Sequence, residues 1–131
     1  MSQRAKVSVC LIVRDEGQSG IFEQCLESIR PHVEEIVIVD TGSTDNTPEI
    51  ARRYADVFEV FTECNSADGL IKDFALVRNR SFDLATRQWI MWMDSDDVIR
   101  GGEHIARLVE HAENEMGGAD RAWCYLFPYE Y

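Results

Sequence analysis

Three aspartates stand within four positions, directly after a run of large apolar residues. The run Trp89–Met93 has the length and side chains of a strand that is buried on both faces, and Asp94, Asp96 and Asp97 follow it. Carboxylates this close repel one another when ionised, so a cation is expected beside them. A hard divalent ion such as Mg²⁺ or Mn²⁺ prefers oxygen ligands and usually also binds the phosphates of a nucleotide. A solvated acidic turn is the alternative, because Asp and Ser are common turn residues.

The composition is that of an acidic globular protein. The 131 residues suit one domain, and 45% of them are hydrophobic and 28% are charged. The 24 acidic and 13 basic residues give a formal net charge of −11, which argues against nucleic acid or an anionic membrane as the main partner. No apolar run approaches the ~20 residues of a membrane span, and the first residues lack the apolar centre of a signal peptide. We therefore expect a cytoplasmic chain without a transmembrane segment.

Neither the cysteines nor the histidines suggest a site of their own. The four cysteines are far apart, they form no Cys-x-x-Cys pair, and no histidine has ligand spacing to them, so zinc is not expected. Three cysteines lie in apolar patterns and are interpreted as reduced core thiols, namely Cys10, Cys25 and Cys124. The histidines lie at a helix end or in the acidic last helix and are expected at the surface (His32, His104 and His111).

Apolar runs of strand length alternate with segments of helical periodicity. The runs predict strands at Lys6–Val13, Glu35–Asp40, Val57–Phe61 and Trp89–Met93. Apolar spacings of three and four residues predict helices from Ile21 to about Arg30, at Pro48–Tyr54, at about Asp73–Ala85 and over Ile105–Ala112.

The segments between these elements also carry signals. Thr47 is placed to cap the helix that starts at Pro48, and the aperiodic stretch Thr62–Leu70 predicts a mobile loop. The pair Gly117-Gly118 predicts the end of the last helix, and Ala122–Tyr131 predicts a final aromatic strand.

The alternation of strands and helices predicts an α/β fold, a three-layer α/β/α sandwich with a mostly parallel sheet. In such sheets, ligands bind beyond the carboxyl ends of the strands, near the point where the strand order reverses. Polar clusters follow three of the predicted strands, at Arg14–Glu16, Asp40–Ser43 and Asp94–Asp97. The chain lacks the glycine-rich fingerprints of dinucleotide-binding proteins and P-loop proteins, so a metal is expected to take any phosphate charge.

Four motifs, in this order, resemble the nucleotide-sugar-binding half of a family 2 glycosyltransferase with the GT-A fold. They are Val7–Glu16, Glu35–Asp45, Val77–Arg80 and Trp92–Asp97, and together they cover about residues 6–100. The resemblance implies that residues 1–131 form a single nucleotide-sugar-binding domain, a truncated or N-terminal part of a longer enzyme. It implies metal-dependent, inverting transfer of a sugar from a nucleotide-diphosphate donor, a UDP-sugar foremost, to an unidentified acceptor hydroxyl.

The resemblance also assigns roles to residues. Residues at the ends of the first two strands surround the base and ribose, namely Val13, Arg14, Glu16, Asp40 and Thr41. Among them, Asp40 accepts a hydrogen bond. Either Lys72 or Arg78 approaches the base or the diphosphate. The segment Asp94-Ser95-Asp96 matches the Asp-x-Asp element of the family, so Asp94 and Ser95 face the donor, and Mn²⁺ or Mg²⁺ is held by Asp94, Asp96 and Asp97.

The general base is expected beyond residue 131, because in the family it lies beyond the donor-binding half. The alternative is a noncatalytic or incomplete nucleotide-sugar-binding module that needs a C-terminal half. Many relatives carry a second acid where this chain has Thr41, which leaves the specificity for uracil open.

A phosphoacceptor receiver domain is disfavoured, because Phe61–Glu63 and Pro128-Tyr129 stand where its aspartate and lysine are needed. A nucleotidyltransferase is disfavoured because Arg14–Gly20 is not its glycine-rich loop.

Overall fold

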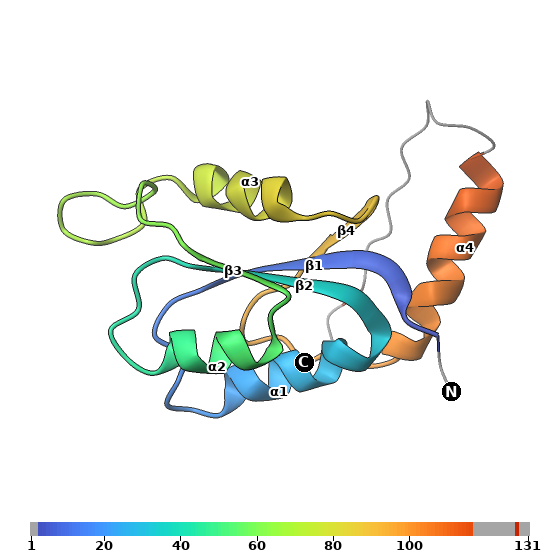
Figure 1. Cartoon of the computed structure of the whole chain (residues 1–131), viewed down its shortest axis with the longest axis horizontal. Helices are drawn as coiled ribbons and strands as arrows, with labels where there is room; N and C mark the ends of the chain where they lie inside the picture. Colours follow the sequence, from blue (N-terminus) through green and yellow to red (C-terminus); the bar gives the residue numbers. More distant parts are fainter. Residues whose placement is uncertain (1–2, 117–127, 129–131) are drawn as a thin grey trace.

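The computed structural model describes residues 3–116 and Pro128, which form a parallel sheet between layers of helices (Figure 1). The elements follow one another as β1 (Ala5–Val13), α1 (Ile21–Ile29), η1 (Arg30–His32), β2 (Val33–Asp40), α2 (Thr47–Tyr54), β3 (Val57–Val60), α3 (Phe74–Leu84), β4 (Trp89–Trp92), η2 (Gly102–His104) and α4 (Ile105–Met116). The predicted alternation of strands and helices is confirmed. The predicted Gly117-Gly118 helix end and the Ala122–Tyr131 strand lie outside the described residues, Pro128 apart.

The strands of the described region are all parallel and lie in the order β3-β2-β1-β4. The chain moves outward from β1 through β2 to β3, and then returns to place β4 on the other side of β1. The strand order therefore reverses between β1 and β4, with Cys10 paired to Trp92 and Val13 paired to Asp40. This confirms the predicted α/β fold, and it brings the end of β4 beside the end of β1.

Helices cover both faces of the sheet, as the three-layer prediction requires. In Figure 1, α1 and α2 lie on one face of the sheet and α3 lies on the other. The larger core joins alternate β1 residues to buried side chains of α1, α2 and α4, among them Leu11, Phe22, Leu26, Ile50 and Ile105. The smaller core lies under α3 and contains Val39, Cys64 and Val77. The period-two alternation of β1 supplies side chains to both cores.

Strand β4 is less buried than its sequence predicts. Trp89 and Met91 pack against the larger core, whereas Ile90 is 46% exposed and Trp92 is 61% exposed. Only alternate side chains are covered, because β4 lies at the edge of the described sheet and α3 packs on β1 and β2. The expectation of a strand buried on both faces is therefore wrong for β4.

The described cysteines are buried free thiols, as predicted for Cys10 and Cys25. Burial raises the pKa of Cys10 to about 11 and that of Cys25 to about 12, so both thiols stay protonated near neutral pH. Cys64 is also buried, although it lies in a loop, and Cys124 lies outside the described residues. Neither Cys10 nor Cys25 is suited to nucleophilic chemistry.

The histidines follow the surface prediction only in part. His104 and His111 are exposed, but His32 is half-buried. A Cβ atom at Gly102 would lie 2.3 Å from the His32 ring, so glycine is what allows η1 and η2 to meet there. His32 is therefore less exposed than expected, because η2, just before α4, packs against η1, just after α1.

A polar network around the buried Glu35 carboxylate fixes β4 at the amino edge of the sheet. The carboxylate of Glu35 is 5% exposed and accepts hydrogen bonds from the Ser8 hydroxyl at 2.7 Å, the Thr86 N–H at 2.8 Å and the Thr86 hydroxyl at 2.6 Å. The Arg87 N–H in turn donates to the Ser8 hydroxyl at 3.0 Å. These bonds join the segment before β4 to β1 and β2. They fix the register of β4 in the sheet and therefore the position at which β4 ends.

Candidate functional site

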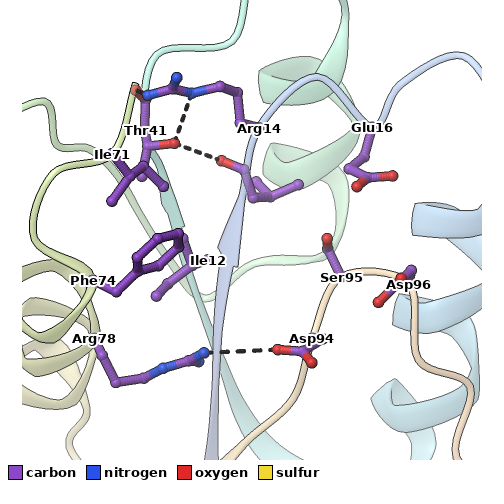
Figure 2. Close-up of a pocket in the computed structure, with 11 residues that line it drawn as sticks. Ile12, Arg14, Glu16, Thr41, Ile71, Phe74, Arg78, Asp94, Ser95 and Asp96 are labelled. Carbon is purple, nitrogen blue, oxygen red and sulfur yellow. Dashed lines mark hydrogen bonds and ion pairs between the residues drawn. The ribbon is translucent and has the colours of Figure 1, made fainter. Parts of the chain in front are cut away.

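A pocket of about 240 Å³ opens at the carboxyl edge of the sheet, where the strand order reverses (Figure 2). Most of the side chains that the sequence assigned to a donor site line it, namely Val13, Arg14, Glu16, Thr41, Arg78, Asp94, Ser95 and Asp96. Three assigned residues do not line it, namely Asp40, Lys72 and Asp97. Three lining residues were not predicted, namely Ile12, Ile71 and Phe74. The tertiary structure thus gathers segments from β1, β2, β4 and α3 around one space.

Arg14 joins the loops at one end of this pocket. Its Nε donates to the Thr41 hydroxyl at 3.0 Å and its Nη2 to the Thr41 carbonyl at 2.6 Å, while its Nη1 donates to the Gly69 carbonyl. Asn65 also donates to the Thr41 carbonyl, at 2.8 Å. The stretch Thr62–Leu70, predicted as a mobile loop, is thus hydrogen-bonded to the wall of the site. Three of its five N–H donors are used in this way, so Arg14 positions the wall.

Asp40 lies beneath the wall and is 1% exposed. Its Oδ1 accepts hydrogen bonds from the Gly42 N–H at 2.8 Å and the Ser43 N–H at 2.7 Å, which folds the turn after β2. Its Oδ2 is buried and has no hydrogen-bond partner in the described part of the chain. A buried carboxylate oxygen without a partner is costly, and Asp40 itself does not line the pocket.

The loops after β1 and β2 are fastened together beside the pocket. The hydroxyl of Thr47 accepts from the Glu16 N–H at 2.8 Å, and the Asp45 carboxylate accepts from the Gly17 N–H at 3.1 Å. A Cβ atom at Gly17 would lie 2.0 Å from the Asn46 side-chain oxygen, so the close contact between the two loops requires glycine at this position. Thr47 lies within α2, and Asn46 takes the cap position without a side-chain bond. The prediction that Thr47 caps this helix is therefore wrong.

We expect Thr47→Val to lower the free energy of unfolding by about 1–2 kcal/mol, because it removes the acceptor of the partly buried Glu16 N–H. Urea unfolding followed by circular dichroism measures this loss. Thr47→Ser keeps the hydroxyl and serves as the matched control, with a smaller loss than Thr47→Val. Equal stabilities for the two variants would show that the hydroxyl does not fasten the loops.

The acidic cluster lies at the other side of the pocket, after β4. Potential ligand oxygens of Asp94, Asp96 and Asp97 all lie within 4.8 Å of one another. Burial and the neighbouring carboxylates raise the pKa of Asp97, although a backbone hydrogen bond opposes the shift. Oxygen donors that repel one another and remain open to solvent fit a hard divalent cation.

Arg78 is the basic residue next to this cluster. Its Nη2 lies 3.7 Å from Asp94 Oδ1, and its guanidinium lies 5.8 Å from the centroid of the Trp92 ring. The Asp94 side chain remains 54% exposed, so this ion pair does not close it off from solvent. Arg78 Nη1 is buried without a hydrogen-bond partner in the described region. Lys72 is exposed and contributes its backbone N–H to the Cys64 carbonyl at 2.8 Å.

Comparison with known proteins agrees with this arrangement. The family model of glycosyl transferase family 2 matches residues 8–120. A TPR repeat-containing protein of Synechococcus elongatus is 38% identical over 95 residues, which are 72% of this chain and 21% of that protein. The uncharacterized glycosyltransferase YibD of Escherichia coli is 27% identical over 130 residues, 95% of this chain and 36% of that protein. The putative glycosyltransferase EpsH of Bacillus subtilis is 35% identical over 98 residues, 70% of this chain and 27% of that protein.

The parallel sheet, its flanking helices and the acidic segment after β4 define an α/β protein of the GT-A type. The chain belongs to glycosyl transferase family 2. It spans between 21% and 36% of the length of these three relatives. None of the described helices is long and apolar enough to cross a membrane.

Proposed function

We propose that this chain binds a nucleotide-diphosphate sugar, and that the whole protein transfers the sugar to an acceptor hydroxyl with inversion. The observation that carries the proposal is the pocket between β1 and β4, which has an acidic side and a side formed by arginines and apolar residues. A nucleoside diphosphate has matching parts, because its phosphates need cations and its base is flat and largely apolar on its faces. A UDP-sugar is the foremost candidate donor.

The acidic side of the pocket is the place for the diphosphate. Asp94, Asp96 and Asp97 would hold Mn²⁺ or Mg²⁺, which fits their three oxygen donors. When bound, the ion supplies positive charge that stabilises the departing diphosphate. Arg78 adds a fixed positive charge beside Asp94, and its unpartnered Nη1 is a donor available to a phosphate oxygen. Ser95 lines the pocket between these carboxylates and contributes a hydroxyl there.

The ends of β1 and β2 are the place for the base and ribose. The unpartnered Asp40 Oδ2 supports a hydrogen bond from a ligand N–H or O–H. Val13, Glu16 and Thr41 line the pocket, and Arg14 holds Thr41 in place. Because three of the five Arg14 N–H donors already hold this wall, we assign Arg14 to the shape of the wall and leave phosphate binding to Arg78.

Sugar transfer also requires a base that takes the proton of the acceptor hydroxyl. This chain matches only 21% and 36% of the length of two of its relatives. This favours an arrangement in which residues 1–131 bind the donor, while the rest of a longer protein supplies the base and the acceptor site. On this view, the chain alone is an incomplete nucleotide-sugar-binding module. Cytoplasmic localisation stays a prediction.

A thermal-shift screen of nucleotide sugars tests donor binding and the metal together. A ligand present at about 100 times its Kd stabilises the folded chain by about 2.7 kcal/mol, which raises the melting temperature of a domain of this size by roughly 5–10 °C. We expect this shift for one class of nucleotide only, and only when Mn²⁺ or Mg²⁺ is present. The same screen in EDTA is the control. Shifts that are equal with and without the ion would contradict metal dependence.

A further inference from the structure

We propose that Phe74 stacks on the nucleobase of the donor, an inference that rests on the proposed function. Phe74 is the first residue of α3 and lines the pocket, and 65% of it is exposed. In the described part of the chain, it belongs to neither apolar core and is not among the half-buried side chains packed against them. The fold therefore does not use this ring for packing. An exposed aromatic ring in a pocket is suited to the flat face of a ligand ring.

The backbone that carries Phe74 is fixed without a ligand. The Asp73 side chain accepts the Leu76 N–H at 3.0 Å and caps α3. The N–H groups of Lys72 and Asp73 both donate to the carbonyl of Cys64, at 2.8 and 3.1 Å, and Cys64 is buried in the smaller core. The backbone that presents the ring is therefore set in advance, which reduces the entropy lost when a ligand binds.

The surroundings of Phe74 indicate which part of a donor it meets. Figure 2 shows its ring beside Ile12, between the Arg14–Thr41 pair and Arg78, whereas the acidic residues lie across the pocket. Arg78 follows Phe74 by one helical turn and therefore lies on the same face of α3. The diphosphate needs cations and belongs near Arg78 and the aspartates. The apolar surface at Phe74 is then left for the base, on the side of Thr41.

The sugar of the donor is a less suitable occupant of this surface. In a nucleotide-diphosphate sugar, the base and the sugar are attached at opposite ends of the diphosphate. Once the diphosphate lies beside Asp94 and Asp96, the two rings lie on opposite sides of it. Asp40, with its unpartnered acceptor, ends β2 next to Thr41, on the side that the proposed function assigns to the base.

Calorimetric titration of UDP and of inorganic pyrophosphate, both in saturating Mn²⁺, tests the stacking. We expect Phe74→Ala to weaken UDP binding by roughly 5- to 100-fold, the usual effect of removing a base-stacking aromatic ring. Pyrophosphate has no base, and its affinity should not change. Phe74→Tyr should restore UDP binding, whereas Phe74→Leu should restore it only in part. Leu76→Ala removes an exposed apolar side chain of the same helix outside the pocket and should leave both affinities unchanged.

Each other outcome overturns the inference in a distinguishable way. Unchanged UDP affinity in Phe74→Ala, with normal binding by the unaltered protein, would remove Phe74 from the base site and leave the proposed function intact. Equal losses for UDP and pyrophosphate would show that Phe74 only supports the shape of the pocket. An unaltered protein that binds neither ligand would overturn the donor site, and the stacking with it.

Discussion

Asp96→Asn is expected to abolish the Mn²⁺-dependent binding of UDP and to leave the fold intact. The substitution removes one of three clustered carboxylates that would hold the ion beside the diphosphate. Because loss of an outer partner of a metal site already costs 10- to 100-fold, loss of a direct ligand should cost at least about 100-fold. Calorimetry in the presence of Mn²⁺ measures this change. Unchanged affinity would remove the metal from the proposed mechanism.

Asp96→Asn should weaken nucleotide binding, but it should stabilise the metal-free protein. Without metal, the three carboxylates repel one another, and the raised pKa of Asp97 reflects this repulsion together with burial. Removing one charge should therefore raise the melting temperature of the metal-free protein slightly. Asp83→Asn makes the same change of charge at an exposed position near the far end of α3, and it should affect neither measurement. A fall in the metal-free melting temperature would indicate that Asp96 has a structural role.

Glu35→Ala is expected to lower the free energy of unfolding by about 3 kcal/mol. The variant leaves the buried Ser8 hydroxyl without its acceptor, a loss that costs about 1–3 kcal/mol, and it also removes the acceptor of both donors of the exposed Thr86. Glu34→Ala is the matched control, because Glu34 meets Arg87 in a half-exposed ion pair at 3.0 Å and should cost less than about 1 kcal/mol. Urea unfolding measures both. Equal losses would contradict the importance of the buried network.

The same carboxylate predicts a dependence on pH. Burial alone raises the pKa of Glu35, but hydrogen bonds from Thr86 and Ser8 and the charge of Arg87 outweigh burial and hold the pKa below its usual value of 4.5. Its contribution to stability is therefore complete above about pH 4.5 and is lost as the pH falls through the lower pKa of the folded state. The difference in stability between the unaltered protein and Glu35→Gln should shrink over that range. A difference that stays constant would contradict the assignment.

The predictions for Asp96 and Glu35 concern opposite ends of β4. The network at Glu35 fixes Thr86 and Arg87 before β4 begins, and the acidic cluster follows where β4 ends. Pairing of Trp89 with Val7 and of Trp92 with Cys10 carries this register along the sheet. The stability of the amino edge therefore helps to place Asp94 beside Arg78 at the carboxyl edge.

Local patterns in the sequence were sufficient for the elements and for the edge that carries the site. Strand and helix periods depend only on neighbouring residues, so the alternation that gives a parallel sheet could be predicted. The polar clusters after Val13, Asp40 and Met93 fall at strand ends, and the strands are parallel, so these clusters had to meet at one edge. The four motifs pointed to the family that the comparisons confirm.

The roles of single side chains within the site depended on contacts between distant segments. Arg14 reaches Gly69, 55 residues away, and this contact joins Arg14 to the wall of the pocket. Phe74 fits the helical pattern of a core residue, but it lies at the pocket, where α3 begins, and no other element of the described part of the chain covers it.

Sequence alone thus determined the parallel α/β sheet, its acidic edge and the family of this protein. Tertiary structure decided the strand order, the inward turn of Asp40, the exposure of β4 and the aromatic surface at Phe74. The physical reason is that periodicity and turn preferences act between neighbours in the chain, whereas burial and hydrogen-bond partners depend on segments that meet only after folding.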